Sequence, residues 1–235
     1  MKKGTFTAIA VLTTAFVVAI ILCVHAMFLP QAVFSSVDVK MRIVLDAGHG
    51  GMDGGVTGKT TGVKESDLNL LLTLALKEEL EDIGFEVILT RKTEAGLYDS
   101  ATKGFKRRDM EKRKEIIQNS KANIVVSLHQ NFYPSKTTRG AQVFYQKEDE
   151  HSKKLALCLQ SALNGVYQKE KVKARNISFA DYFILQCSTN PSVLIECGFL
   201  SSAEDEKLLL TPSFRQKLVS GMAQGILAFL SEFSA

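Results

Sequence analysis

Short apolar runs alternate with longer amphipathic stretches through most of this chain. Runs rich in β-branched residues predict strands at residues 42–46, 86–90, 123–128, 141–146, 181–185 and 193–197. Apolar residues three and four positions apart predict a helix from Glu65 to Ile83 that Gly84 ends, and further helices over about 105–120, about 150–167 and from Pro212. Strands alternating with helices indicate an α/β fold with a mostly parallel sheet and helices on both faces.

The N-terminal segment has a different pattern. Lys2 and Lys3 precede a run from Phe6 to Leu29 that holds no formally charged residue. This pattern is typical of a signal peptide or a signal anchor. About 20 apolar residues span a bilayer, whereas a cleavable apolar region has about 7–15, so the length favours an anchor. A weak cleavage site at residues 24–26 leaves cleavage open.

We therefore expect three parts. Residues 1–29 are a signal anchor or signal peptide, residues 30–40 a tether, and residues 41–235 a single folded domain. The two lysines place the N-terminus inside the cell, so the domain is expected to be exported, outside the cytoplasmic membrane and either membrane-anchored or secreted.

Composition and charge narrow the function classes. The chain has 46% hydrophobic and 23% charged residues, as globular proteins do, and its net charge of +4 is too small to indicate a nucleic-acid partner. One segment is strongly basic, with Lys103, Lys106, Arg107, Arg108, Lys112, Arg113 and Lys114. A solvated helix face with interleaved acidic residues explains such a run, and attraction to an anionic polymer or membrane surface is the alternative.

The four cysteines show no CxxC pairing. Cys158 lies in an apolar run and is expected to be a core thiol. Cys187 and Cys197 each follow an apolar run, so they could lie at neighbouring strand ends and form a disulfide in an exported protein. Because disulfide geometry is strict, free thiols are favoured.

Chemically reactive side chains stand at the ends of three predicted strands. His49 follows the first strand, His129 follows the strand at 123–128, and Glu196 lies on the last. Ligands of open α/β sheets collect at the carboxyl ends of strands, so these side chains predict one polar site. Glycines surround His49, which would suit a phosphate-binding loop, but the GxGxxG pattern is absent and close approach to a metal or substrate is preferred.

A carboxylate completes a set of metal ligands. Glu65 opens the first amphipathic helix, where alone it would only complement the helix dipole. With His49 and His129 it gives the His₂Glu set of a catalytic zinc site that keeps one position open. Asp46 could accept the other imidazole N–H of His49, or could cap a local turn. Glu196, on an apolar strand, would have the raised pKa that suits a general base, which indicates metal-assisted amide hydrolysis.

At these residues the sequence resembles the zinc-dependent N-acetylmuramoyl-L-alanine amidases of bacterial cell walls. The matching motifs are residues 45–55, the segment around Glu65, Thr90-Arg91, residues 127–131 and residues 191–201. The resemblance implies a mixed, mainly parallel six-stranded sheet in one catalytic domain, Zn²⁺ on His49, Glu65 and His129, and a catalytic Glu196. Asp46 and Asn131 are expected in supporting or substrate-contacting positions.

The resemblance also implies a biological setting. The substrate would be the peptidoglycan muropeptide, cut between muramic acid and L-alanine. The segment at 101–108 and the N-terminal apolar run are similar to sporulation members of the family. For those, the implied role is removal of stem peptides from spore cortex, so that muramic δ-lactam forms for germination. Some relatives need a protein activator.

Two departures and three rival functions remain. The chain departs from the family at Cys197 and at Ser202, where an asparagine is common. A zinc carboxypeptidase uses similar ligands and would trim peptide ends instead. A thiol hydrolase would use Cys197 with His129. A silent, membrane-tethered wall-binding module would bind metal and wall without cleaving them.

Overall fold

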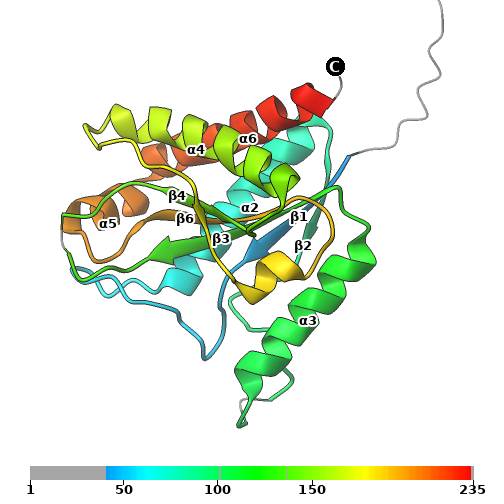
Figure 1. Cartoon of the computed structure of the whole chain (residues 1–235). Helices are drawn as coiled ribbons and strands as arrows, with labels where there is room; N and C mark the ends of the chain where they lie inside the picture. The colour runs from blue at the N-terminus through cyan, green and yellow to red at the C-terminus, as the bar shows by residue number, and fades with distance from the viewer. Residues whose placement is uncertain (1–40, 101, 136, 234–235) are drawn as a thin grey trace, which may run out of the picture. The chain divides into compact units, whose positions relative to one another are not determined.

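A six-stranded sheet organises the domain (Figure 1). The computed structural model describes residues 41–233 except 101 and 136, so the expected anchor at 1–29 and tether at 30–40 lie outside the described residues. The strands are β1 (Arg42–Ala47), β2 (Glu86–Leu89), β3 (Ile124–Asn131), β4 (Gln142–Tyr145), β5 (Ser178–Phe179) and β6 (Ser192–Phe199). The helices are α2 (Glu65–Ile83), α3 (Phe105–Ser120), α4 (Glu150–Gln168), the 3₁₀ helix η1 (Phe183–Gln186), α5 (Ala203–Leu210) and α6 (Pro212–Phe233).

The strand order is β2-β1-β3-β6-β4-β5. Among the described strands, only the β4–β6 pair is antiparallel. The sheet is therefore mixed and mainly parallel, as the family resemblance implies. Because β1, β3 and β6 are parallel neighbours, their carboxyl ends meet at one edge of the sheet, which is where the functional site of an α/β fold is expected.

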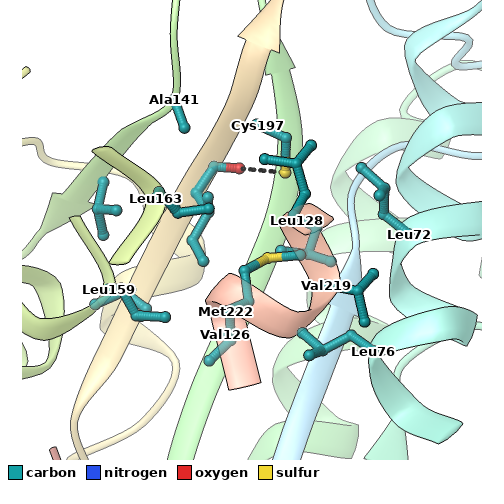
Figure 2. Packing of buried hydrophobic residues seen from close by; sticks show 14 of the residues in the cluster. Leu72, Leu76, Val126, Leu128, Ala141, Leu159, Leu163, Cys197, Val219 and Met222 are labelled. Carbon is teal, nitrogen blue, oxygen red and sulfur yellow. Dashed lines mark hydrogen bonds between the residues drawn. The ribbon is translucent and has the colours of Figure 1, made fainter. Parts of the chain in front are cut away.

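Helices cover the two faces of the sheet unequally. Helices α2, α4 and α6 pack on one face over a large apolar core (Figure 2). Helix α3 and η1 cover the other face over a much smaller cluster (Figure 1). Side chains alternate along β6, so Val193, Ile195 and Cys197 enter the large core while Leu194 enters the small one. Glu196 therefore faces the thinner layer.

The helix ends have local causes. Gly84 follows α2 with φ of 109°, a conformation that glycine adopts without strain, as the sequence predicts. Asp149 caps α4 by accepting hydrogen bonds from the backbone N–H groups of His151 and Ser152. Ser202 caps α5, a short helix that hydrophobic spacing did not predict, and its hydroxyl accepts from the Asp205 N–H at 3.3 Å.

One predicted strand is wrong. Residues 181–185 do not form a strand, because Phe183–Gln186 make a 3₁₀ turn and the sixth strand is the two-residue β5 at Ser178–Phe179. In this segment Ile184 and Leu185 are buried while Tyr182 and Phe183 are exposed. Burial of adjacent residues suits a helical turn, since a strand would alternate. Within the described residues, no helix combines the length and apolar character needed to cross a membrane.

Candidate metal centre and cleft

The three residues predicted as ligands converge. His49 follows β1, Glu65 is the first residue of α2, and His129 lies near the end of β3. Each offers one ligand atom, and these atoms lie within 4.8 Å of one another. Two imidazoles and a carboxylate match the donor chemistry of a catalytic zinc site, so these side chains fit the metal that the sequence predicts.

Glu65 is the centre of the cluster. It is 2% exposed, and its Oε1 lies 2.8 Å from His129 Nδ1 and 3.2 Å from His49 Nε2. Backbone N–H groups of Val56 and Gln130 donate to its two oxygens at 2.9 and 3.1 Å. Burial alone would raise the pKa of Glu65, but hydrogen bonds from the two histidines hold it well below its usual range. Glu65 is therefore an anion at neutral pH, as a metal ligand must be.

The loop after β1 shapes the position of both imidazoles. His49 has φ of 61°, a left-handed conformation that is uncommon for a residue with a side chain. The ring of His129 lies against Gly48, where a Cβ would clash with the imidazole. The two imidazole rings meet edge to face, with centroids 4.9 Å apart. Strain of this kind persists only where neighbouring groups hold the backbone in place.

Two arginines hold that backbone. Arg113 of α3 donates to the carbonyl oxygens of Ala47 and His49 at 2.7 and 2.6 Å. Arg91 donates to the carbonyls of Ala47 and Gly48 at 2.9 and 3.1 Å. Both arginines are almost fully buried. The loop carrying His49 is therefore fixed by charge-assisted hydrogen bonds rather than by apolar packing.

The carboxylate that orients His49 is Asp53. Its Oδ2 lies 3.0 Å from His49 Nδ1, which leaves Nε2 to face Glu65. The sequence offers Asp46 as a candidate for this contact, but the structure places Asp46 elsewhere. Asp46 accepts hydrogen bonds from Thr90, Ser127 and Arg113, each at 2.6 Å. Asp46 instead connects β1 to the end of β2, to β3 and to α3.

Glu196 lies beside the cluster. Strand register pairs it with His129, so both side chains rise from the same face of adjacent strands. Burial raises the pKa of Glu196 to about 7, with the nearby imidazoles opposing that shift. Its buried Oε2 has no hydrogen-bond partner among the described residues. A carboxyl group in this state can accept and release a proton near neutral pH.

Two depressions flank the cluster. One, of about 400 Å³, is walled by α3 and η1 with apolar side chains such as Phe105, Met110 and Phe183. The other, of about 350 Å³, is lined by Asn131 and Phe132 among others. Both are lined by His49, Asp53, Lys106, His129 and Glu196. A substrate can therefore extend to either side of the candidate metal centre, and Asn131 lies along one of these sides.

Cys197 has no access to this site. It is fully buried in the large core, and its Sγ lies 3.9 Å from the Ile195 carbonyl oxygen (Figure 2). Burial raises the pKa of its thiol well above the usual range, so the thiolate nucleophile of a thiol hydrolase does not form there. Cys187 belongs to the small cluster on the opposite face of the sheet, and among the described residues neither Cys187 nor Cys197 is in a disulfide.

Sequence reasoning did not find Asp53, Arg91, Arg113 or Asn69 as supporting residues. Asn69 of α2 is fully buried, and its amide donates to the Gly48 carbonyl oxygen at 3.1 Å and accepts from Gln130. A signal for Asp53 exists, since it lies in the same glycine-rich loop as His49. Arg91 belongs to the Thr90-Arg91 motif, which carried no assigned role, and all of the other three contact elements far from them in sequence.

Comparison with known proteins agrees with the geometry. Residues 43–228 match the family model described as N-acetylmuramoyl-L-alanine amidase. The germination-specific N-acetylmuramoyl-L-alanine amidase of Bacillus subtilis is 35% identical over 193 residues, which cover 81% of this chain and 80% of that relative.

Two solved structures share the fold. The CwlD amidase from Clostridioides difficile, solved in complex with the GerS lipoprotein, has 39% identity and a TM-score of 0.78, covering 82% of this chain and 100% of that one. An N-acetylmuramoyl-L-alanine amidase from Clostridium difficile 630 has 30% identity and a TM-score of 0.71, covering 82% and 97% of the two chains.

Proposed function

Because this chain belongs to the N-acetylmuramoyl-L-alanine amidase family, we propose that it hydrolyses the muramoyl–alanine amide with Zn²⁺ held by His49, Glu65 and His129 and with Glu196 as general base. The peptidoglycan amidase activity follows from the family. The observation that supports the residue roles is the convergence of three ligand atoms next to a buried carboxyl whose pKa is about 7.

The residues divide the work as follows. A zinc ion, when bound, polarises the scissile carbonyl and lowers the pKa of water. Glu196 takes the proton from the attacking water and delivers it to the leaving alanine nitrogen, which departs as an amine. His49, held by Asp53 and the two arginines, keeps a fixed orientation throughout. Apolar side chains of the larger depression, such as Phe105 and Phe183, can pack against the substrate beside the reacting amide.

We further propose that the substrate lies in spore cortex, where removal of stem peptides permits δ-lactam formation for germination. The support is the similarity to the amidase of Bacillus subtilis that is named germination-specific. The chain would be exported and held at the membrane by residues 1–29, with residues 30–40 as a tether. The neighbour solved with a lipoprotein supports a protein partner for this chain as well.

Glu196→Gln tests the catalytic role. Because the amide cannot accept the proton, we expect muropeptide cleavage to fall by about 100-fold or more. The zinc content of the purified variant, measured by mass spectrometry, should equal that of the wild type. Glu78→Gln, on the exposed side of α2, is the matched control and should keep full activity. Equal cleavage by Glu196→Gln and the wild type would contradict the mechanism, and absence of cleavage by both would suit a silent binding module.

Mass spectrometry of digested muropeptides separates the remaining enzyme class. An amidase frees the alanine amino group and leaves a complete peptide and a peptide-free sugar. A zinc carboxypeptidase leaves the sugar–peptide bond intact and shortens the peptide. Intact sugar–peptide bonds with trimmed peptide ends would overturn the assignment.

A further inference from the structure

The basic residues of the segment from Lys103 to Lys114 have different environments. Arg113 is buried beneath the site, and Arg108 donates to carbonyl oxygens of its own preceding loop, including that of Ser100 at 2.8 Å. Lys112 pairs with Glu115 at 2.7 Å on the solvent side of α3. Of these four, Lys106 and Arg113 line the larger depression, and of that pair only Lys106 is exposed. The segment is therefore not simply a solvated basic face.

Lys106 is held at the candidate metal centre while still open to solvent. Its Nζ lies 2.9 Å from Asp53 Oδ1, and the other oxygen of Asp53 contacts His49. The Lys106 side chain is 64% exposed and lines both depressions. An ammonium group has three donors, so Lys106 can keep Asp53 and bind a further anion.

Of the Lys and Arg side chains described as lining the larger depression, one is exposed and one is buried. Lys106 and Arg113 are the Lys and Arg side chains among its described lining residues. Arg113 is 1% exposed and spends its donors on Asp46, Asp109 and backbone carbonyls. Apolar side chains, including Phe105 and Met110, line the same depression together with the acidic residues Asp53 and Asp109. Apart from the proposed Zn²⁺, an anion entering this depression therefore meets one exposed Lys or Arg side chain among the described lining residues, Lys106.

The charge of the substrate lies on its peptide side. Once the lactyl carboxyl of muramic acid is in amide linkage, the acetamido sugars next to the bond are neutral. The stem peptide carries a free carboxylate on the acidic residue that follows the alanine. One extended residue advances a peptide by about 3.3–3.6 Å, so this carboxylate lies a short way beyond the scissile amide. Lys106 is connected to His49 through the single carboxylate of Asp53, so its ammonium group also lies a short way from the candidate metal centre.

We propose that Lys106 is a specificity-determining residue that binds the free carboxylate of the second stem-peptide residue and so directs the peptide into the depression between α3 and η1. This inference rests on the proposed function, because it says which part of the substrate occupies one of the two depressions beside the proposed metal centre. It predicts that the enzyme distinguishes acidic stem peptides from amidated ones, and that the sugars extend past Asn131 and Phe132.

The test uses two muropeptides that differ only in whether the glutamate α-carboxyl is free or amidated. We expect the wild type to prefer the free carboxylate by about fivefold to tenfold in kcat/KM, mainly through KM, as a charged hydrogen bond in a half-open site provides. Lys106→Met should lose this preference, and Lys106→Arg should keep most of it. Lys112→Met, on the same helix but away from the depression, should behave as the wild type.

Two results would overturn the inference. One is a wild type that cleaves both muropeptides equally well. The other is a Lys106→Met variant whose kcat falls equally on both, since Lys106 would then act through Asp53 on His49. Calorimetric binding of both muropeptides to Glu196→Gln reads the preference without turnover. Absence of cleavage by the wild type contradicts the proposed function, and the binding preference then decides the inference separately.

Discussion

Gly48 and His129 are in close contact within the candidate site. The imidazole of His129 lies where a side chain at position 48 would project. At the scale of single residues, this contact explains why the residue before His49 has no side chain. It also couples two predicted ligands through packing, in addition to their shared contact with Glu65.

Gly48→Ala tests that coupling. The added methyl group must displace the His129 ring, so we expect zinc affinity to fall by at least about tenfold and amidase activity to fall with it. Gly165→Ala is the matched control, because a Cβ there meets open space inside α4 and should raise stability by about 0.5–1 kcal/mol. Zinc titration of both variants checks the prediction. Unchanged affinity in Gly48→Ala would show that the ring accommodates the methyl group.

Residue type alone predicted which side chains gather at the site. Two histidines at strand ends and a glutamate that opens a helix predicted His49, His129 and Glu65, and the structure brings these three together. The same reasoning considered Asp46 as the partner of His49, whereas Asp53 makes that contact. The choice depends on how the glycine-rich loop turns back after β1, and neighbouring carboxylates in a sequence do not reveal that turn.

At the scale of elements, a buried ion pair joins β1 to α3. Arg113 Nη1 lies 2.6 Å from Asp46 Oδ1, and both side chains are 2% exposed. Burial would raise the pKa of Asp46, but the Arg113 charge and the Ser127 and Thr90 hydrogen bonds lower it from 3.8 to about 2. The folded state therefore favours the charged carboxylate, and α3 stays on the sheet partly through this pair.

Asp46→Asn should consequently change the response to acid. The lowered pKa stabilises the folded wild type by about 2 kcal/mol above pH 3.8, and this contribution disappears as pH falls toward 2. We expect the variant to be less stable than the wild type by about 2–4 kcal/mol at pH 6, because Arg113 loses a charged partner. Urea unfolding at pH 6, 4 and 3 should show this difference narrowing as pH falls. The exposed Asp82→Asn control should show little difference, and a constant gap for Asp46→Asn would contradict the linkage.

Periodicity predicted most elements but not the short ones. Helix α2 and strands β1 and β6 have the spacing that the sequence shows, because each buries a long regular face. The segment around Ile184 is apolar enough for a strand, yet it turns to place adjacent residues under the sheet. In a segment of four or five residues, the two-residue repeat of a strand and the three-residue repeat of a 3₁₀ helix cannot be distinguished. Tertiary packing therefore determines which of the two forms.

At the scale of the whole molecule, the candidate site joins segments from β1, α2, β3 and β6. Their order in the sheet could not be read from the sequence, since β6 lies between β3 and β4. The supporting roles of Arg91, Arg113 and Asn69 depend on that order. This is why the clustering of His49, Glu65 and His129 was predictable from residue types and the surroundings of the cluster were not.

Removal of the proposed metal should lower the thermal stability of the domain, because the metal would connect segments from β1, α2 and β3. Because a bound ion stabilises only the folded state, we expect a chelator to lower the melting temperature of the zinc-loaded protein by about 5–15 °C. Differential scanning fluorimetry with and without chelator measures the shift. In His49→Ala, which lacks one proposed ligand, the same chelator should have little effect. Identical melting temperatures for the loaded and stripped wild type would count against a metal at this cluster.

The position of β6 has a consequence for biosynthesis. This strand is the last to leave the ribosome, yet it fills a slot in the middle of the sheet and brings Glu196 with it. Until β6 inserts, no strand connects β4 and β5 to β3. The pairing of β6 with β3 joins residues far apart in sequence, and such long-range pairing folds slowly. The nascent chain thus lacks its proposed general base until its final fifth has been synthesised.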